Sequence, residues 1–199
     1  ALRHDIYDRA INTAELANNR DHFELRFITP YRQVIEPQVQ RQGLEMSWVY
    51  GLMRQESRFI APARSSAGAQ GLMQVMPATG QWVAGKIGLP NYSQRMLTDP
   101  DTNVLLGTSY MRIILDDLDN HPVLASAGYN AGPGRARRWR DERPLEGAIY
   151  TETIPFDETR DYVKKVMANT VIYAALLEGR PQSLKARLGT IAPRTDSGS

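Results

Sequence analysis

The chain has 199 residues, a formal net charge of +2 and no cysteine. This length suits one domain of ordinary size, whose core can form without disulfides or metal. The lack of cysteine excludes a thiol nucleophile, Cys-bound zinc and iron–sulfur clusters, which leaves carboxylates, hydroxyls, amides and histidine. The three histidines (His4, His22 and His121) are widely separated and form neither an H-x-H nor an H-E-x-x-H pattern. We therefore expect no metal and no cofactor.

The charge balance is mild, with 24 basic residues against 22 acidic ones. A nucleic-acid binder usually concentrates a larger basic excess on one face. No apolar run approaches the length of a membrane span, and no signal peptide opens the chain. Residue 1 is Ala rather than Met, so we expect a product from which a targeting segment has been lost upstream.

Nearly every periodic segment is typical of a helix, which predicts an all-α fold. Residues 1–29 are expected to form a helical lead-in that Pro30 interrupts, and the next helix spans 31–43 with a break or kink at Pro37. Ser47 is a candidate cap for the helix that follows.

Two later helices have clear boundaries. Asp99 and Pro100 satisfy the geometry of a helix start, which predicts a helix through Leu118. A second helix is predicted from about Asp157 to Glu178, with Gly179 as its stop. The polar tail at 181–199, which ends Thr-Asp-Ser-Gly-Ser, is expected to be frayed.

Residues 47–59 contain a carboxylate on an apolar face. At about 100° per residue, that face carries four apolar side chains, Val49, Leu52, Met53 and Ile60. Arg54 and Arg58 lie opposite, whereas Glu56 falls among the apolar group. Burying an unpaired carboxylate raises its pKa, which is what a general acid needs. The alternative is that Glu56 ends the amphipathic stretch and pairs with an arginine.

Two further segments combine small residues with polar groups. Residues 65–77 place two glycines near Gln74, whose amide suits sugar amides and hydroxyls. The alternative is a tight loop with its methionines in the core. Residues 125–134 place Tyr129 before a Gly-Pro-Gly breaker, so that it projects from a crowded helix end or is simply buried there. Neither segment fits a phosphate loop.

In combination these segments closely resemble the soluble lytic transglycosylases, goose-type-lysozyme-like enzymes that cleave peptidoglycan. The resemblance covers roughly residues 31–180. It rests on four motifs that occur in the family order, namely Glu56-Ser57, Gly71-Leu72-Met73-Gln74, Ala127-Gly128-Tyr129-Asn130-Ala131-Gly132 and the 152–162 segment ETIPFDETRDY. Gly128 departs from the Ala that the family more often has before the tyrosine. The resemblance implies a lysozyme-like (goose-type) catalytic domain at 30–180, preceded at 1–29 by the end of an α-superhelical linker.

By this resemblance Glu56 is the sole catalytic acid and base, Ser57 supports it at the helix end, and Tyr129 hydrogen-bonds near its carboxyl group. Positions that match the family's glycan groove are Ser65, Gln74, Met76, Tyr110, Asn130 and Glu158. Each of these groove residues is also compatible with a purely structural role.

The implied reaction cleaves the β-1,4 bond between N-acetylmuramic acid and N-acetylglucosamine and leaves a 1,6-anhydro end. The alternatives are a hydrolytic muramidase and a non-catalytic peptidoglycan-binding module. A peptidoglycan substrate implies the periplasm of a Gram-negative bacterium, with association to the outer membrane or cell wall and other cell-wall enzymes as further partners.

A separate motif is the arginine-rich run at 135–143, which contains five arginines and one tryptophan. Asp141 and Glu142 dilute its charge, so a solvated helix face is the favoured interpretation. Attraction to the acidic peptide stems of peptidoglycan comes next, and nucleic-acid binding is the third hypothesis. We expect no nucleic-acid partner.

Overall fold

The computed structural model describes residues 6–16, 23–179 and 181–194. Its first helices are α1 (Tyr7–Leu16), α2 (Phe23–Arg26), α3 (Arg32–Gln42), α4 (Met46–Ser57) and α5 (Pro77–Lys86), followed by the 3-10 helix η2 (Gln94–Thr98). The later helices are α6 (Pro100–Asp117), α7 (Pro122–Ala131), α8 (Pro133–Arg138), α9 (Gly147–Thr153), α10 (Asp157–Glu178) and α11 (Leu184–Leu188). The strands β1 (Leu145–Glu146) and β2 (Thr190–Ile191) form one antiparallel pair. The prediction of an all-α fold is therefore confirmed.

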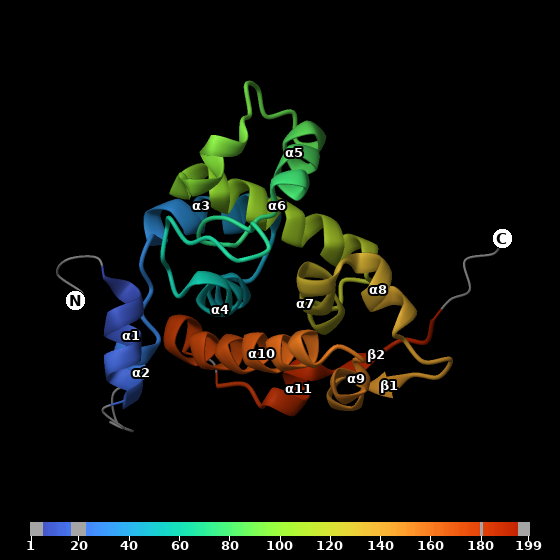
Figure 1. Cartoon of the computed structure of the whole chain (residues 1–199). Helices are drawn as coiled ribbons and strands as arrows, with labels where there is room; N and C mark the ends of the chain where they lie inside the picture. Colours follow the sequence, from blue (N-terminus) through green and yellow to red (C-terminus); the bar gives the residue numbers. More distant parts are fainter. Residues whose placement is uncertain (1–5, 17–22, 180, 195–199) are drawn as a thin grey trace.

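Helix α4 lies in the middle of the molecule, next to the long helix α10 (Figure 1). Most of its side chains are buried, including Trp48, Tyr50, Leu52 and Met53. The Trp48 indole N–H donates to the Ser126 hydroxyl of α7 at 3.1 Å, so a polar group in the core has a partner. The helix that carries Glu56 is thus held on several sides.

Within the described part of the 1–29 segment, α1 and α2 are helical and residues 27–29 are not. Residues 1–5 and 17–22 of that segment lie outside the described residues. Arg54, placed opposite the apolar face by the sequence pattern, is only 9% exposed because it meets this segment. Its guanidinium stacks on Phe27 at 4.5 Å and pairs with Glu15 at 2.7 Å.

Three helix boundaries agree with prediction. The Asp99 carboxylate accepts from Thr102 N at 2.9 Å and caps α6, and α10 ends before Gly179, which has a φ of 61°. Helix α3 also begins after Pro30 as predicted, but it continues through Pro37, so the break predicted there as one of two alternatives is absent.

Two details of the α4 prediction are wrong. The helix is capped at Glu45, not at Ser47, which is fully buried inside the first turn. Ile60 is 36% exposed rather than part of the buried face, because the helix ends at Ser57 and the chain turns away.

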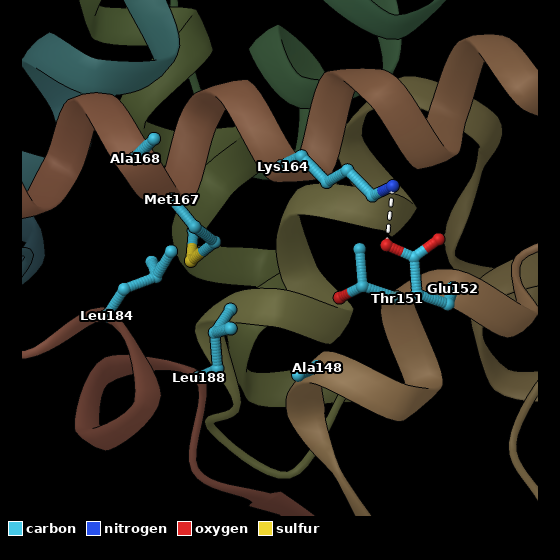
Figure 2. Close-up of a pocket in the computed structure, with 8 residues that line it drawn as sticks. All are labelled: Ala148, Thr151, Glu152, Lys164, Met167, Ala168, Leu184 and Leu188. Atoms are coloured by element: carbon cyan, nitrogen blue, oxygen red, sulfur yellow. Dashed lines mark ion pairs between the residues drawn. The ribbon is translucent and has the colours of Figure 1, made fainter.

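The predicted frayed tail is also wrong for residues 184–191. Leu184 and Leu188 of α11 lie against Met167 of α10 and Ala148 of α9 around an apolar cavity of about 400 Å³ (Figure 2). Strand β2 then pairs with β1, where Ile191 is buried. Tertiary contacts therefore order a segment that has little helical signal of its own. The last residues, 195–199, lie outside the described part.

Across the ranges 6–16, 23–179 and 181–194, we find no helix long and apolar enough to span a bilayer.

Candidate active site

Glu56 lies one residue before the end of α4, partly buried among side chains from other helices. The Tyr162 hydroxyl of α10 donates a hydrogen bond to Glu56 Oε1 at 2.6 Å. The flanking arginines, Arg54 and Arg58, instead pair with Glu15 at 2.7 and 3.1 Å. The structure therefore disfavours the alternative in which Glu56 is neutralised by a neighbouring arginine.

Burial raises the pKa of the Glu56 carboxyl to about 7, because the charged form loses hydration. The Tyr162 hydrogen bond acts in the opposite direction, since it stabilises the carboxylate, while the negative charge of Glu158 raises the pKa further. A carboxyl with this pKa exists in both protonation states near neutral pH. It can therefore donate a proton and later accept one.

Ser57 holds the end of α4 in place. Its hydroxyl donates to the Leu72 carbonyl at 2.7 Å and accepts from Phe59 N at 3.1 Å. Arg58 and Phe59 follow with φ values of 49° and 66°, so the chain reverses sharply directly after the candidate acid. Ser57 thus fixes the helix end to the 71–74 motif.

The 61–76 loop is anchored by Asn103 of α6. The Asn103 amide accepts from Met73 N at 2.8 Å and donates to the carbonyls of Gln70 and Leu97 at 2.9 and 2.7 Å. Gly71 has a φ of 81°, and a Cβ there would lie 2.2 Å from Asn103 Nδ2. Glycine is therefore required at Gly71 both for its backbone conformation and for space.

Five of the predicted residues, among them Met76 and Tyr110, line one small cavity. Its volume is about 200 Å³, and its full lining is Gln74, Val75, Met76, Thr79, Tyr110, Tyr129, Asn130 and Gly132. Gln74 has a φ of 47°, and its Nε2 donates to the Ala63 and Gly71 carbonyls at 3.1 and 2.8 Å. The side-chain amide is thereby fixed on the cavity wall.

Tyr129 and Tyr110 form the aromatic part of this wall. Their ring centroids are 5.3 Å apart, and the Tyr129 hydroxyl donates to the Met73 carbonyl at 2.8 Å. Burial and the charge of Glu56 raise the pKa of Tyr129 well above its usual value, so the phenol stays protonated. Tyr129 therefore lies within the electrostatic reach of Glu56, although its own hydrogen bond goes to the loop.

The remaining predicted residues occupy different positions. Asn130 Oδ1 accepts from Thr159 at 2.7 Å, which joins α7 to the start of α10 beside the exposed Glu158. Ser65 is exposed, does not line the cavity, and accepts a hydrogen bond from Ala69 N at 3.0 Å.

Tyr162 is the residue that sequence reasoning missed. It is almost completely buried, and burial together with the Glu56 charge raises its pKa well above the usual value for tyrosine. The only available signal was its place at the end of the 152–162 motif, since it lies 106 residues from Glu56 in the chain. Its contact with Glu56 depends on how α10 packs against α4.

The larger apolar cavity between α9, α10 and α11 is a poorer candidate for chemistry. Its main polar feature is the ion pair between Lys164 and Glu152, at 2.5 Å (Figure 2). Within the described ranges no group of three or more His, Asp or Glu side chains could hold a metal. His121 caps α7, and His4 and His22 lie outside the described residues.

Comparison with known proteins places these features in a family. Residues 33–149 match the sequence model of the Transglycosylase SLT domain, and residues 153–182 match that of the Soluble lytic transglycosylase helical domain. The soluble lytic murein transglycosylase of Escherichia coli K12 is 33% identical over 189 residues, which are 94% of this chain and 29% of that protein.

Two solved structures are similar. One is the lytic transglycosylase Slt of Pseudomonas aeruginosa, solved as an inactive mutant with a glutamate replaced by glutamine. It is 40% identical with a TM-score of 0.86, and the match covers 92% of this chain and 30% of that one. The other is the 70-kDa soluble lytic transglycosylase of Escherichia coli, at 31% identity and a TM-score of 0.83, covering 97% and 31%.

The chain thus spans about a third or less of the length of these relatives. The fold is lysozyme-like, as the resemblance predicted. Because the SLT domain model matches more than half of its residues, this chain belongs to the Transglycosylase SLT domain family.

Proposed function

We propose that this protein is a peptidoglycan lytic transglycosylase. It cleaves the β-1,4 bond between N-acetylmuramic acid and N-acetylglucosamine and leaves a 1,6-anhydromuramic end. The observation that carries the proposal is the Glu56 carboxyl, whose pKa burial raises to about 7 beside the Tyr129 cavity. The relatives named as lytic murein transglycosylases support the same activity, as does the inactive glutamate-to-glutamine mutant among them.

In the first step, protonated Glu56 donates its proton to the glycosidic oxygen, and the bond to muramic C1 breaks. The N-acetyl group of the substrate stabilises the positive charge that develops at C1. Tyr162 then stabilises the carboxylate that Glu56 has become, because its hydroxyl donates to Oε1.

In the second step, ionised Glu56 removes the proton of the muramic C6 hydroxyl, and that oxygen bonds to C1. Glu56 is protonated again, no water is consumed, and no second carboxylate is required. The nucleophile belongs to the same sugar, so its placement replaces a bimolecular encounter.

The groove residues have proposed roles in holding the glycan. Gln74, Met76, Tyr110 and Asn130 line the cavity beside Tyr129, and Ser65 and Glu158 are assigned to the groove by resemblance. We also assign Ser57 and Tyr129 as support for Glu56. The residues at 30–180 form the catalytic domain in this proposal, without metal or cofactor.

A peptidoglycan substrate also places the protein in the periplasm of a Gram-negative bacterium, and the Gram-negative origin of the relatives supports this location. The alternative of a nucleic-acid partner is disfavoured, because Arg137, Arg140 and Arg143 of the 135–143 run already pair with aspartates.

Weighing the products by mass spectrometry tests the proposal. Purified sacculi treated with this chain should release muropeptides that are lighter by one water than those of a hydrolytic lysozyme. Hydrated, reducing ends would indicate the muramidase alternative, and binding without release would indicate a non-catalytic module.

The Glu56→Gln variant tests the assignment of the acid. It should lose turnover and keep glycan binding, since the amide preserves shape but carries no transferable proton. Retained turnover in this variant would refute the role of Glu56.

A further inference from the structure

The sulfur chemistry of this chain is confined to its methionines. The sequence contains seven methionines and no cysteine, so no thiol consumes an oxidant before it reaches a thioether. Peroxides convert the methionine thioether into a sulfoxide, which replaces a flexible apolar side chain by a polar one. All seven methionines lie within the described residues, and their burial decides where this oxidation begins.

Met76 is the most exposed of these methionines, with 41% of its surface exposed. Met46 and Met96 are only partly exposed. The other four are fully buried, namely Met53, Met73, Met111 and Met167. Because an oxidant in solution must contact the sulfur atom, we expect the Met76 thioether to react first.

The backbone on both sides of Met76 is fixed. Val75, directly before it, exchanges two backbone hydrogen bonds with Gln70 at 3.0 and 2.9 Å. Pro77, directly after it, begins α5, and the Met76 carbonyl accepts from Gly80 N at 2.8 Å in the first turn of that helix. The Met76 side chain therefore stays at the cavity wall whether or not its sulfur is oxidised.

This side chain forms part of the candidate active site. It lines the cavity of about 200 Å³ together with Gln74, Tyr110 and Tyr129. As a thioether it offers a sugar an apolar surface. A sulfoxide oxygen accepts hydrogen bonds from water, and a ligand that covers this oxygen without replacing those bonds binds less tightly. The added oxygen also takes up space in a small cavity.

We propose that the Met76 thioether is a modification site at which oxidation by a peroxide weakens glycan binding. The effect on the glycan rests on the proposed function, whereas the selectivity for Met76 rests on its exposure. The sulfur lone pair bonds to one peroxide oxygen as the O–O bond breaks, so sulfur loses two electrons. The second oxygen takes up the proton of the transferred oxygen and leaves as water. A methionine sulfoxide reductase reverses the change.

The first experiment follows the oxidation of each methionine in the whole chain. The protein is treated with hydrogen peroxide for increasing times, and its tryptic peptides are fragmented in a mass spectrometer to locate each sulfoxide. Met76 should be oxidised several-fold faster than Met46 or Met96. Oxidation of either of these two residues at the rate of Met76 would overturn the proposed selectivity.

Binding of chitotetraose, a peptide-free β-1,4 oligomer of N-acetylglucosamine, measures the effect on the glycan. The oxidised parent chain should bind it about tenfold more weakly, and a methionine sulfoxide reductase should restore the affinity. Met76→Leu, given the same peroxide treatment, should keep the affinity that it had before treatment. Met96→Leu is the matched control and should lose affinity like the parent chain. Equal losses in Met76→Leu and Met96→Leu would refute the role of Met76.

Protection by the glycan is a further readout. Saturating chitotetraose should slow the oxidation of Met76 and leave that of Met96 unchanged, because only Met76 lines the cavity. Unchanged oxidation of Met76, or no binding of chitotetraose by the untreated chain, would contradict the proposed effect on the glycan.

Cleavage of sacculi separates this proposal from the proposed function. Peroxide should slow the parent chain and Met96→Leu, whereas Met76→Leu should keep its own starting rate. An untreated parent chain that releases no fragments contradicts the proposed function, and the order of oxidation together with chitotetraose binding then still decides the modification site.

Discussion

At the scale of single residues, the proton of Glu56 is controlled by burial and by two neighbours on α10, Tyr162 and Glu158. Burial favours the protonated form, the Tyr162 hydroxyl favours the carboxylate, and Glu158 opposes it. Tyr129 is itself protonated and lies within electrostatic reach of Glu56. The balance leaves the pKa of Glu56 at about 7, which suits a group that acts in turn as acid and base.

Replacing Tyr162 by Phe should raise the pKa of Glu56, because burial and Glu158 remain while the stabilising hydrogen bond is lost. Since the first step needs protonated Glu56, activity falls as the pH rises through this pKa. The alkaline limb of kcat/KM should therefore move to higher pH, by about one unit.

The matched control is Tyr150→Phe, a buried tyrosine whose hydroxyl donates to the Ala136 carbonyl and not to Glu56. Its pH profile should coincide with that of the parent chain. An alkaline limb that stays in place in Tyr162→Phe would show that this hydrogen bond does not tune the acid.

At the scale of elements, Asn103 connects the 61–76 loop to the rest of the fold. The loop is held internally by isolated β-bridges and local hydrogen bonds, and Asn103 of α6 ties it to η2 with three further hydrogen bonds. The loop carries the Gln74 wall of the candidate active site. Its conformation therefore matters to the proposed function.

Asn103→Ala should lower the free energy of unfolding by about 3 kcal/mol, because it leaves Met73 N and the Leu97 carbonyl without partners and removes one of the two hydrogen bonds to the Gln70 carbonyl. Urea denaturation measures this loss. The loop should also exchange its Gln70 and Met73 amide hydrogens faster. A loss below about 1 kcal/mol would mean that water or neighbouring groups replace the amide.

The contact between α1 and α4 depends on a second group, the Glu15 carboxylate. It pairs with Arg54, which is only 9% exposed, and with Arg58. Burial acts to raise the pKa of Glu15, but the two arginines outweigh this effect, so the pKa is lowered. A lowered carboxyl pKa stabilises the fold above the pKa of the unfolded chain, and this stabilisation is lost as the pH falls through the folded value.

Glu15→Gln should therefore cost about 2 kcal/mol of unfolding free energy at pH 7, since it leaves Arg54 buried without its counter-charge. The difference should shrink in acid. Glu24→Gln, on the exposed face of α2, is the control and should change stability by less than about 0.5 kcal/mol. Equal effects of the two variants in urea denaturation would contradict the assignment.

At the scale of the whole molecule, the candidate acid reduces stability as the pH rises above about 4.5. The pKa of Glu56 is about 7 in the folded chain, against 4.5 for the free group. The folded state therefore binds more protons than the unfolded state between these values, and the free energy of unfolding falls as the pH rises through them.

Glu56→Gln removes this penalty, because the amide does not ionise. Relative to the parent chain, the variant should gain stability steadily as the pH rises from 4.5 to about 7, up to about 3 kcal/mol, and the gain should level off above that pH. Urea denaturation across this pH range measures it. A difference that does not vary with pH would show that Glu56 keeps an ordinary pKa.

The sequence by itself determined the features that depend on neighbours along the chain. Helical periodicity, the Asp99 cap and the Gly179 stop predicted α6 and α10 because these signals are local. The carboxylate of Glu56 on an apolar helix face is visible for the same reason, within two turns, although that pattern alone left its role open. The ordered motifs then indicated the family that the comparisons identified.

Only the tertiary structure decided which distant groups meet. Tyr162, not Tyr129, donates to Glu56, because α10 packs beside α4. Residues 184–191 are ordered because α11 lies on α9 and α10, although their sequence alone suggested fraying. These contacts depend on packing between segments far apart in the chain, and local propensity carries no information about them.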